Sequence, residues 1–220
     1  MRTYSVTITG KTPLLMHHDN IEWADFMEDW KSNPQNKKTS KAGDDRSPAW
    51  RWLGCVYHDG KHLAIPQANI MKCLMEGGAM GPVPGGKMGK TFKSQTQSGM
   101  MSVQPFWLLT INGNPIAWSD VEAMKDIGEF GAHKARTREL GFELLVKRAA
   151  VGASKHVRVR PQFAMGWQAH GEIAVWDDQI TDQALSDIFE YAGQYKGIGD
   201  WRPGAPKKPG PYGTFSAEIS

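Results

Sequence analysis

The sequence predicts an α+β fold, in which helices and an antiparallel sheet belong to one domain. Short segments of alternating or continuous apolar residues are typical of strands, and two longer segments carry apolar residues at helical spacing. The chain has 220 residues, of which 40% are hydrophobic and 22% are charged, as in a globular protein. This length favours a single domain over residues 1–220.

The first predicted elements are two strands and a helix. Apolar and hydroxyl side chains alternate over Thr3–Thr9, so we expect the first strand there. A short strand is expected at His62–Pro66, and Pro66 suits the start of a helix, because the first helical residue needs no N–H. That helix has an apolar stripe over Ile70–Met75 and is expected to stop at Gly77–Gly78.

The middle of the chain predicts a strand, a short helix and a hairpin. Phe106–Ile111 is a continuous apolar run, which indicates a buried strand. Ser119 and Glu122 have the spacing of a capping box at the start of a helix. Phe142–Val151 and His156–Phe163 flank a short Gly-containing turn, so we expect them to pair as a hairpin.

The last predicted elements complete the order of the core. We expect a strand at Ile173–Trp176, a helix that begins at Thr181 and ends at Gly193, and a final strand at Thr214–Ile219. Without insertions, the order is strand, helix, strand, strand, helix, strand. This is the ferredoxin-like (RRM-like) βαββαβ core, in which two helices cover one face of an antiparallel sheet.

Three segments fit none of these elements and are predicted to be long insertions. Residues 17–52 are polar and are expected to form a thumb-like loop with one short helix at Trp23–Trp30. Residues 77–102 are expected to form a flexible loop, and residues 196–213 a structured Gly/Pro-rich loop. Long loops in compact domains are usually functional, so we expect the binding residues in and beside these insertions.

Charge is unevenly distributed along the chain, although Lys and Arg number 26, Asp and Glu number 23, and the net charge is only +3. Acidic residues gather in residues 19–29 and 172–190, and basic residues in residues 31–51, 133–160 and 196–208. Two of the basic clusters contain Trp, and cations with indole rings suit the phosphates and bases of a single strand. Solvated surface faces are the alternative interpretation. The contacts predicted from this pattern are Lys87, Lys90, Lys93, Arg136, Arg138, Lys147, Arg148, His156, Arg158, Arg160, Trp201 and Arg202.

Candidates for catalysis are two aspartates and two histidines. Asp44 or Asp45 could supply a carboxylate for general acid–base or metal-assisted cleavage, and His17 or His18 an imidazole; solvated turns and surface histidines are the alternatives. The two cysteines lack the spacing of a zinc or redox motif, so no metal and no cofactor is expected.

No part of the sequence predicts membrane association. No stretch approaches the roughly 20 consecutive apolar residues that span a bilayer. The N-terminal segment has no apolar run followed by a small-residue cleavage site, as a signal peptide has. We therefore expect a cytoplasmic protein.

Several segments, in the same order along the chain, resemble the RAMP superfamily and, within it, the Cas7-like backbone subunits of CRISPR effector complexes. The similar segments are Val6–Gly10 with Lys11–His17 (opening strand and bend), Leu63–Lys72 (strand-to-helix motif, with Gln67-Ala68-Asn69 where the family has Gly-Ser-Ser), and Gly197–Pro203 through Tyr212–Phe215 (glycine-rich loop). The resemblance implies that Asn69 and Lys72 meet the backbone of a guide RNA at a helix N-terminus. It also implies that Asp44 or Asp45 lies in the region where type III relatives carry an RNA-cleaving aspartate.

The residues and the resemblance together predict a protein that binds single-stranded nucleic acid, RNA or DNA, without regard to sequence. We expect copies to oligomerise along a guide RNA as the backbone filament of a CRISPR-type ribonucleoprotein for antiviral defense, beside other subunits of the complex and without catalysis of their own. One alternative is a RAMP-fold RNA endonuclease that uses a loop Asp or His. The other is a guide-free protein of a phage or mobile element that coats or anneals single-stranded DNA.

Overall fold

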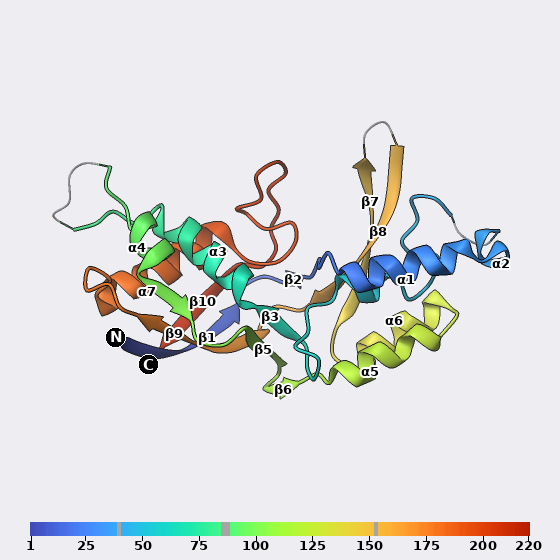
Figure 1. The fold of residues 1–220 in the computed structure, drawn as a ribbon, viewed down its shortest axis with the longest axis horizontal. Coiled ribbons are helices and arrows are strands. Elements are labelled where there is room, and N and C mark those ends of the chain that lie inside the picture. Colours follow the sequence, from blue (N-terminus) through green and yellow to red (C-terminus); the bar gives the residue numbers. More distant parts are fainter. Residues whose placement is uncertain (39–40, 85–88, 152–153) are drawn as a thin grey trace.

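The computed structural model describes residues 1–38, 41–84, 89–151 and 154–220. It has an α+β fold with two antiparallel sheets (Figure 1). The first sheet has the strand order β10-β1-β9-β5-β3, and β4 and β6 extend it beside β9 and β5. The second sheet has the order β2-β8-β7. Figure 1 shows the first sheet with α3, α4 and α7 in the left half of the molecule, and the β7–β8 hairpin with α1, α2, α5 and α6 in the right half.

The first sheet contains most of the predicted strands. Its strands are β1 (Arg2–Gly10), β3 (Ala64–Pro66), β4 (Met100–Ser102), β5 (Phe106–Ile111), β6 (Asn114–Pro115), β9 (Gln168–Val175) and β10 (Phe215–Ile219). Strand β1 lies between β10 and β9, and it pairs with β10 through Val6 and Ile219 and with β9 through Arg2 and Val175. The strands expected near residues 3–9, 62–66, 106–111, 173–176 and 214–219 are therefore confirmed, with shifted ends.

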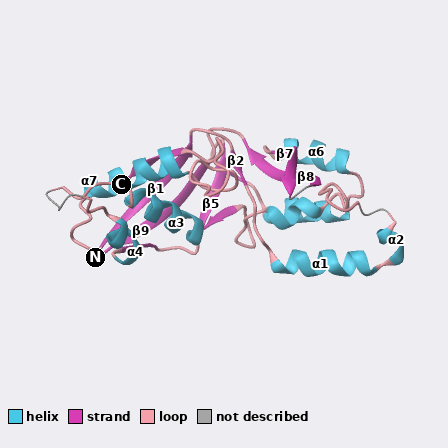
Figure 2. Cartoon of the chain, turned by 90° about the horizontal axis from the view of Figure 1, so that it is seen from above, coloured by secondary structure: helices cyan, strands magenta, loops and turns pink. Residues whose placement is uncertain are grey.

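Three helices cover one face of this sheet (Figure 2). They are α3 (Gln67–Gly78), α4 (Lys93–Ser98) and α7 (Asp182–Tyr191). Val6 and Ile8 of β1 are buried, as are Leu74 of α3 and Leu185 of α7, so the core lies between the sheet and these helices. Thr181 caps α7 by accepting a hydrogen bond from the Ala184 amide, as predicted.

One helix end agrees with the prediction and one differs. Helix α3 ends at Gly78, as predicted, and Gly77 lies where a Cβ would overlap the backbone of Ala192. Gly193 does not end the second helix, since a π-helical turn, η3 (Ala192–Lys196), continues from α7. Gly197, with φ +65°, ends that turn.

The second sheet is built on the predicted hairpin. Strands β7 (Glu143–Val151) and β8 (Ser154–Phe163) pair over their whole length, and β2 (Leu14–Leu15) pairs with the other edge of β8. Helix α6 (Phe130–Glu139) packs beside β7, and α1 (Ile21–Ser32) packs against η1 (Arg51–Cys55). The short elements of this half are α2 (Pro34–Lys37), η1 (Arg51–Cys55), α5 (Trp118–Glu122) and η2 (Ala123–Asp126).

Within residues 17–52, where the sequence predicts a thumb-like loop with one short helix, the structure has the helices α1 and α2 and the start of η1. Helix α1 begins at Ile21, before the expected start at Trp23, and ends at Ser32, after the expected end at Trp30. The Asn20 side chain caps its start by accepting hydrogen bonds from the Glu22 and Trp23 amides. Trp23 and Trp30 of α1 pack against the buried Trp50, with ring centroids 5.8 and 6.2 Å apart. These aromatic contacts lie within the segment, and the Trp52 indole N–H, which donates to Nδ1 of His133 over 3.0 Å, joins the segment to α6 (Phe130–Glu139).

Two further predictions are wrong. Within residues 77–102, the expected flexible loop contains α4 and β4, and Met100 is buried where β4 pairs with β9. Ser119 and Glu122 do not form a capping box: the helix begins one residue earlier, at the buried Trp118, and has no side-chain cap. Trp118 instead stacks on His58, with ring centroids 3.8 Å apart.

In the part of the chain that the structure describes, every helix is too short or too polar to cross a membrane.

Candidate nucleic-acid interface

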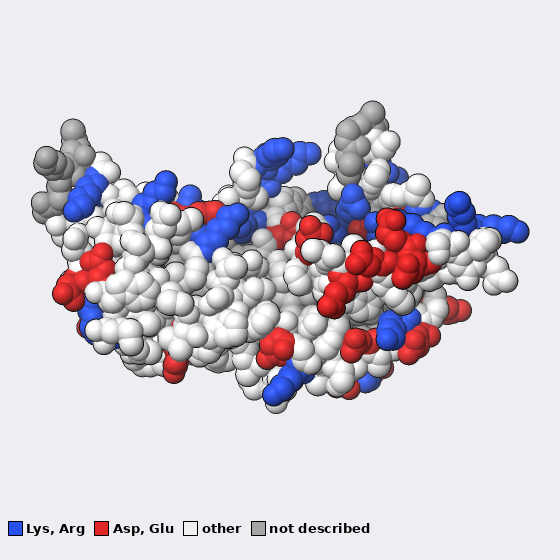
Figure 3. Space-filling model, in the orientation of Figure 1, with Lys and Arg blue, Asp and Glu red and all other residues white. Residues whose placement is uncertain are grey.

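A basic cavity of about 480 Å³ lies between the β7–β8 hairpin, the end of β2 and the Gly/Pro-rich loop of residues 196–213. The residues that line it are Leu15, His17, Leu145, Lys147, Arg148, Ala149, Ala150, Arg158, Arg160, Asp200, Trp201, Ala205 and Lys208. Figure 1 shows the hairpin and this loop standing out from the same edge of the molecule. Figure 3 shows Lys and Arg side chains along that edge, and acidic side chains over α1 on the face turned to the viewer.

Strand alternation creates the cationic wall of the cavity. Residues directly opposite each other in an antiparallel pair share a face, and Lys147 lies opposite Arg158 in the hairpin register. Arg160, two residues along β8, projects to the same face, while Val159 between them is fully buried on the other. The basic row that the sequence predicts on β8 thus stands beside a lysine from β7.

The buried carboxylate of Asp45 holds the arginines of this wall. Its oxygens lie 3.1 Å from Nη1 of Arg158, 3.4 Å from Nη1 of Arg160 and 3.5 Å from Nη1 of Arg51. Asp200 accepts a further hydrogen bond from Nε of Arg160, over 3.1 Å. Three guanidinium groups therefore face two carboxylates, which leaves an excess of positive charge beside the cavity.

His17 borders the cavity as a neutral imidazole. Its Nε2 accepts a hydrogen bond from Nη2 of Arg160 over 3.2 Å, and its Nδ1 lies 3.7 Å from Asp200. Burial and then the charge of Arg160 lower the pKa of His17. Because Arg160 occupies the Nε2 lone pair, the proton of neutral His17 is on Nδ1, which leaves no free lone pair to act as a base.

The other catalytic candidates lie outside the cavity. Asp44 is paired with Arg46, whose Nη2 donates over 2.6 Å, and this hydrogen bond lowers the pKa of Asp44. His18 stands beside Tyr57, with ring centroids 5.5 Å apart, and its buried Nδ1 has no hydrogen-bond partner among the described residues. Within those residues, no three His, Cys, Asp or Glu side chains are grouped to hold a metal ion.

Trp201 forms the aromatic side of the cavity. The ammonium group of Lys147 lies 3.4 Å from the centre of its ring. The ring also packs against Tyr212, with centroids 5.4 Å apart. Cation and indole, which the sequence places in separate clusters, are therefore in direct contact.

Other predicted contact residues are dispersed or have protein partners. Arg202 pairs with Glu76 of α3, and His156 packs against Gly43. On α6, Arg136 pairs with Glu139 over 2.8 Å and Arg138 with Glu143 over 3.5 Å. Asn69 interacts with the Tyr57 hydroxyl from the first turn of α3, and Lys72 and Lys93 are exposed on α3 and α4. Lys87 lies outside the described residues.

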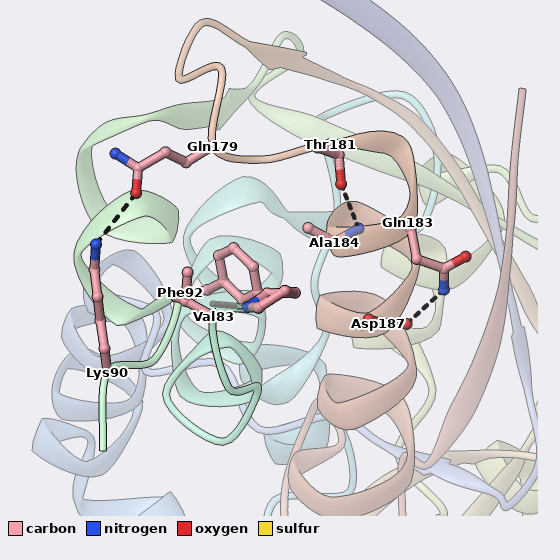
Figure 4. A pocket seen from close by; sticks show the side chains of 9 residues that line it. Val83, Lys90, Phe92, Gln179, Thr181, Gln183, Ala184 and Asp187 are labelled. Atoms are coloured by element: carbon pink, nitrogen blue, oxygen red, sulfur yellow. Dashed lines mark hydrogen bonds between the residues drawn. The ribbon is translucent and has the colours of Figure 1, made fainter. Parts of the chain in front are cut away.

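Lys90 belongs to a second cavity, of about 400 Å³, which it lines together with Val83, Pro84, Phe92 and the start of α7 (Figure 4). Its ammonium lies 3.5 Å from the side-chain oxygen of Gln179, and Asp187 lines the same cavity. One cation and one carboxylate balance there, so this cavity has less attraction for a polyanion than the basic cavity.

Sequence reasoning missed two residues of the basic cavity. Lys208 lines it from the Gly/Pro-rich loop, and its place in the cluster around Trp201 was a usable signal. Asp200 orients Arg160 and gave no such signal, because nothing local distinguishes it from a solvated loop aspartate.

Comparison of the sequence with models of protein families and with curated proteins gives no match.

Proposed function

We propose that this chain binds single-stranded RNA, without regard to sequence, in the basic cavity. The observation that carries the proposal is convergence: Lys147, Arg148 and Arg158 of the hairpin meet Trp201 of a distant loop around one cavity. Cations neutralise phosphates whatever the sequence, and an indole offers a stacking face that every base can use. The floor of alanine and leucine side chains suits the apolar faces of a ribose and a base.

We also propose that the first sheet and its helices form a ferredoxin-like core of the RAMP type. In chain order β1, α3, β5, β9, α7 and β10 read strand, helix, strand, strand, helix, strand. The sheet order β10-β1-β9-β5 places the first strand of that series between the last and the third, as in the split βαβ arrangement, with β3 as an added edge strand. The sequence resemblance to Cas7-like subunits supports the same assignment.

In this proposal, copies assemble side by side along a guide RNA in the cytoplasm, as the backbone of a CRISPR-type ribonucleoprotein. The β7–β8 hairpin takes the projecting, thumb-like role expected of residues 17–52, because it stands out from the body (Figure 1), while Trp52 joins those residues to His133 of α6. The acidic side chains of α1, seen on one face in Figure 3, offer neighbouring copies a surface of opposite charge to the basic edge.

Fluorescence anisotropy with labelled single-stranded RNA and DNA, at about 50 and 200 mM salt, tests the binding. We expect RNA binding that weakens by about tenfold or more between the two salt concentrations, because several phosphate contacts release counterions. Lys147→Ala with Arg148→Ala should lower the affinity about tenfold or more. Lys125→Ala is the matched control, since this exposed lysine lies on η2, away from the cavity.

The same samples separate the alternatives. A gel that shows shortened RNA would favour the endonuclease, and equal affinity for DNA would favour the guide-free coating protein. No binding to either strand would overturn the proposal. Electron micrographs of the protein with RNA test the assembly, because arcs or filaments are expected and dispersed single copies would contradict it.

A further inference from the structure

The backbone of Trp201 has a conformation that its loop must impose. Its φ is +50°, a left-handed value that is rare for a bulky residue. The other non-glycine residue with positive φ in the described chain, Asn112, precedes Gly113 in the turn between β5 and β6, where this conformation is ordinary. Strained backbone at a bulky residue is concentrated at binding sites.

The surroundings of Trp201 hold its indole in place. Asp200 accepts a hydrogen bond from the Trp201 amide over 2.9 Å, and the Trp201 carbonyl accepts one from Tyr212 over 3.4 Å. Gly210 passes so close that a Cβ there would overlap the indole ring. The ring is therefore preorganised at the cavity wall.

Lys147 covers this ring in the free chain. Its ammonium is 3.4 Å from the ring centre, close enough for a cation–π contact, and the side chain is exposed on a flexible stem. On the opposite strand, Arg158 presents a guanidinium to the same face of the hairpin. A phosphate drawn to Arg158 would therefore lie within reach of the Lys147 ammonium.

We propose that Trp201 is the platform on which one base of the bound strand stacks, and that Lys147 occupies this platform until the base arrives and then moves to a phosphate. This inference rests on the proposed function and adds to it the residue that contacts a base of the bound strand. The exchange is favourable because stacking replaces one contact of the indole, while the ammonium gains a phosphate. Binding stays independent of the RNA sequence, because every base has a π face that can stack on the indole.

Two strands of equal length test the stacking: an oligouridine, and a sugar–phosphate strand without bases. Trp201→Ala should lower the affinity for oligouridine by about 5- to 100-fold and change the affinity for the abasic strand less than about twofold. Trp201→Phe keeps a stacking ring and should restore most of the loss. Trp176→Ala is the control, because Trp176 is also exposed, follows the last residue of β9 and does not line the cavity.

Lys147→Met tests the exchange, because methionine keeps much of the length and removes the charge. We expect lower affinity for both strands and a salt dependence smaller by about one phosphate contact. The ratio of oligouridine to abasic affinity should stay at the wild-type value or rise. A ratio that falls as far as in Trp201→Ala would mean that Lys147 holds the ring in its binding position, which overturns the exchange.

The outcomes separate this inference from the proposed function. If the wild-type protein binds neither strand, the proposed function fails and the inference with it. If Trp201→Ala loses both strands equally and Trp201→Phe restores neither, RNA binding stands but stacking is overturned. Indole fluorescence gives a second readout should Trp201→Ala not fold: oligouridine should quench the wild type more than Trp201→Phe, and equal quenching contradicts stacking.

Discussion

The guanidinium group of Arg202 donates hydrogen bonds to both carboxylate oxygens of Glu76, over 2.8 and 3.2 Å. This pair joins the Gly/Pro-rich loop to α3, and the Arg202 side chain is only 13% exposed. We expect Arg202→Gln and Glu76→Gln each to lower the free energy of unfolding by ~2 kcal/mol, because each leaves its partner partly buried and unpaired. The double variant should lose less unfolding free energy than the two single variants lose together. Urea unfolding of all three measures this, and losses that add within ~0.5 kcal/mol would contradict the coupling.

Asp45 is expected to be needed for stability and not for RNA cleavage. Its carboxylate is buried among three arginines, so Asp45→Asn removes the negative charge that all three share and should cost ~3 kcal/mol of unfolding free energy. Asp44→Asn is the matched control and should cost ~1 kcal/mol or less, because its partner Arg46 is exposed. The loss of a negative charge beside the cavity should not weaken RNA binding. If the wild type cleaves RNA, and the Asp45→Asn protein is as stable as the wild type but does not cleave it, the result would support the endonuclease instead.

Local patterns were enough to predict the longer strands but not the short ones. The apolar run Phe106–Ile111 coincides with β5, whereas β2, β4 and β6 have only two or three residues each and carry too little pattern to be found. Helix α6 escaped prediction because its buried residues, His133 and Thr137, are polar and make no apolar stripe. Helix α1 was underestimated for a similar reason, since Met27 is its one buried residue.

The cations and the indole of the candidate site could be found from the sequence, but their partners could not. Asp45 lies 113 residues from Arg158 along the chain, and Glu76 lies 126 residues from Arg202. No local signal links residues so far apart. The sequence therefore predicts both Arg202 and Lys147 as RNA contacts. Of these two residues, only Lys147 lines the cavity.

His133 should make the protein less stable in mild acid. It is fully buried; its Nδ1 accepts from Trp52 over 3.0 Å, and its Nε2 donates to the Ile127 carbonyl over 2.9 Å. Burial lowers the pKa of His133, so below about pH 6.5 the unfolded chain binds a proton that the folded chain does not. The unfolding free energy should therefore fall between about pH 7 and 5, by up to ~1.4 kcal/mol per pH unit for this one group.

Replacement of His133 by a side chain that does not titrate shows how much of the decrease in unfolding free energy is due to His133. His133→Gln keeps an acceptor and a donor, and urea unfolding at several pH values should show a shallower decline than in the wild type. His17 and His58, whose pKa values are also lowered by burial, contribute equally to both proteins and cancel in the difference. Parallel curves for the two proteins would contradict the role of His133.

Gly210 should be as important for RNA binding as the indole that it borders. A Cβ at this position would overlap both the ring and the backbone of Trp201, so Gly210→Ala must displace the platform. We expect its affinity for oligouridine to fall by about 5- to 100-fold, as in Trp201→Ala, with little change for the abasic strand. Gly128→Ala is the control, because its Cβ would meet no atom within 4 Å. Near-UV circular dichroism reports whether the rest of the aromatic packing is kept. A Gly210→Ala protein that is native by this measure and binds oligouridine as tightly as the wild type would show that the position of Trp201 does not matter for binding.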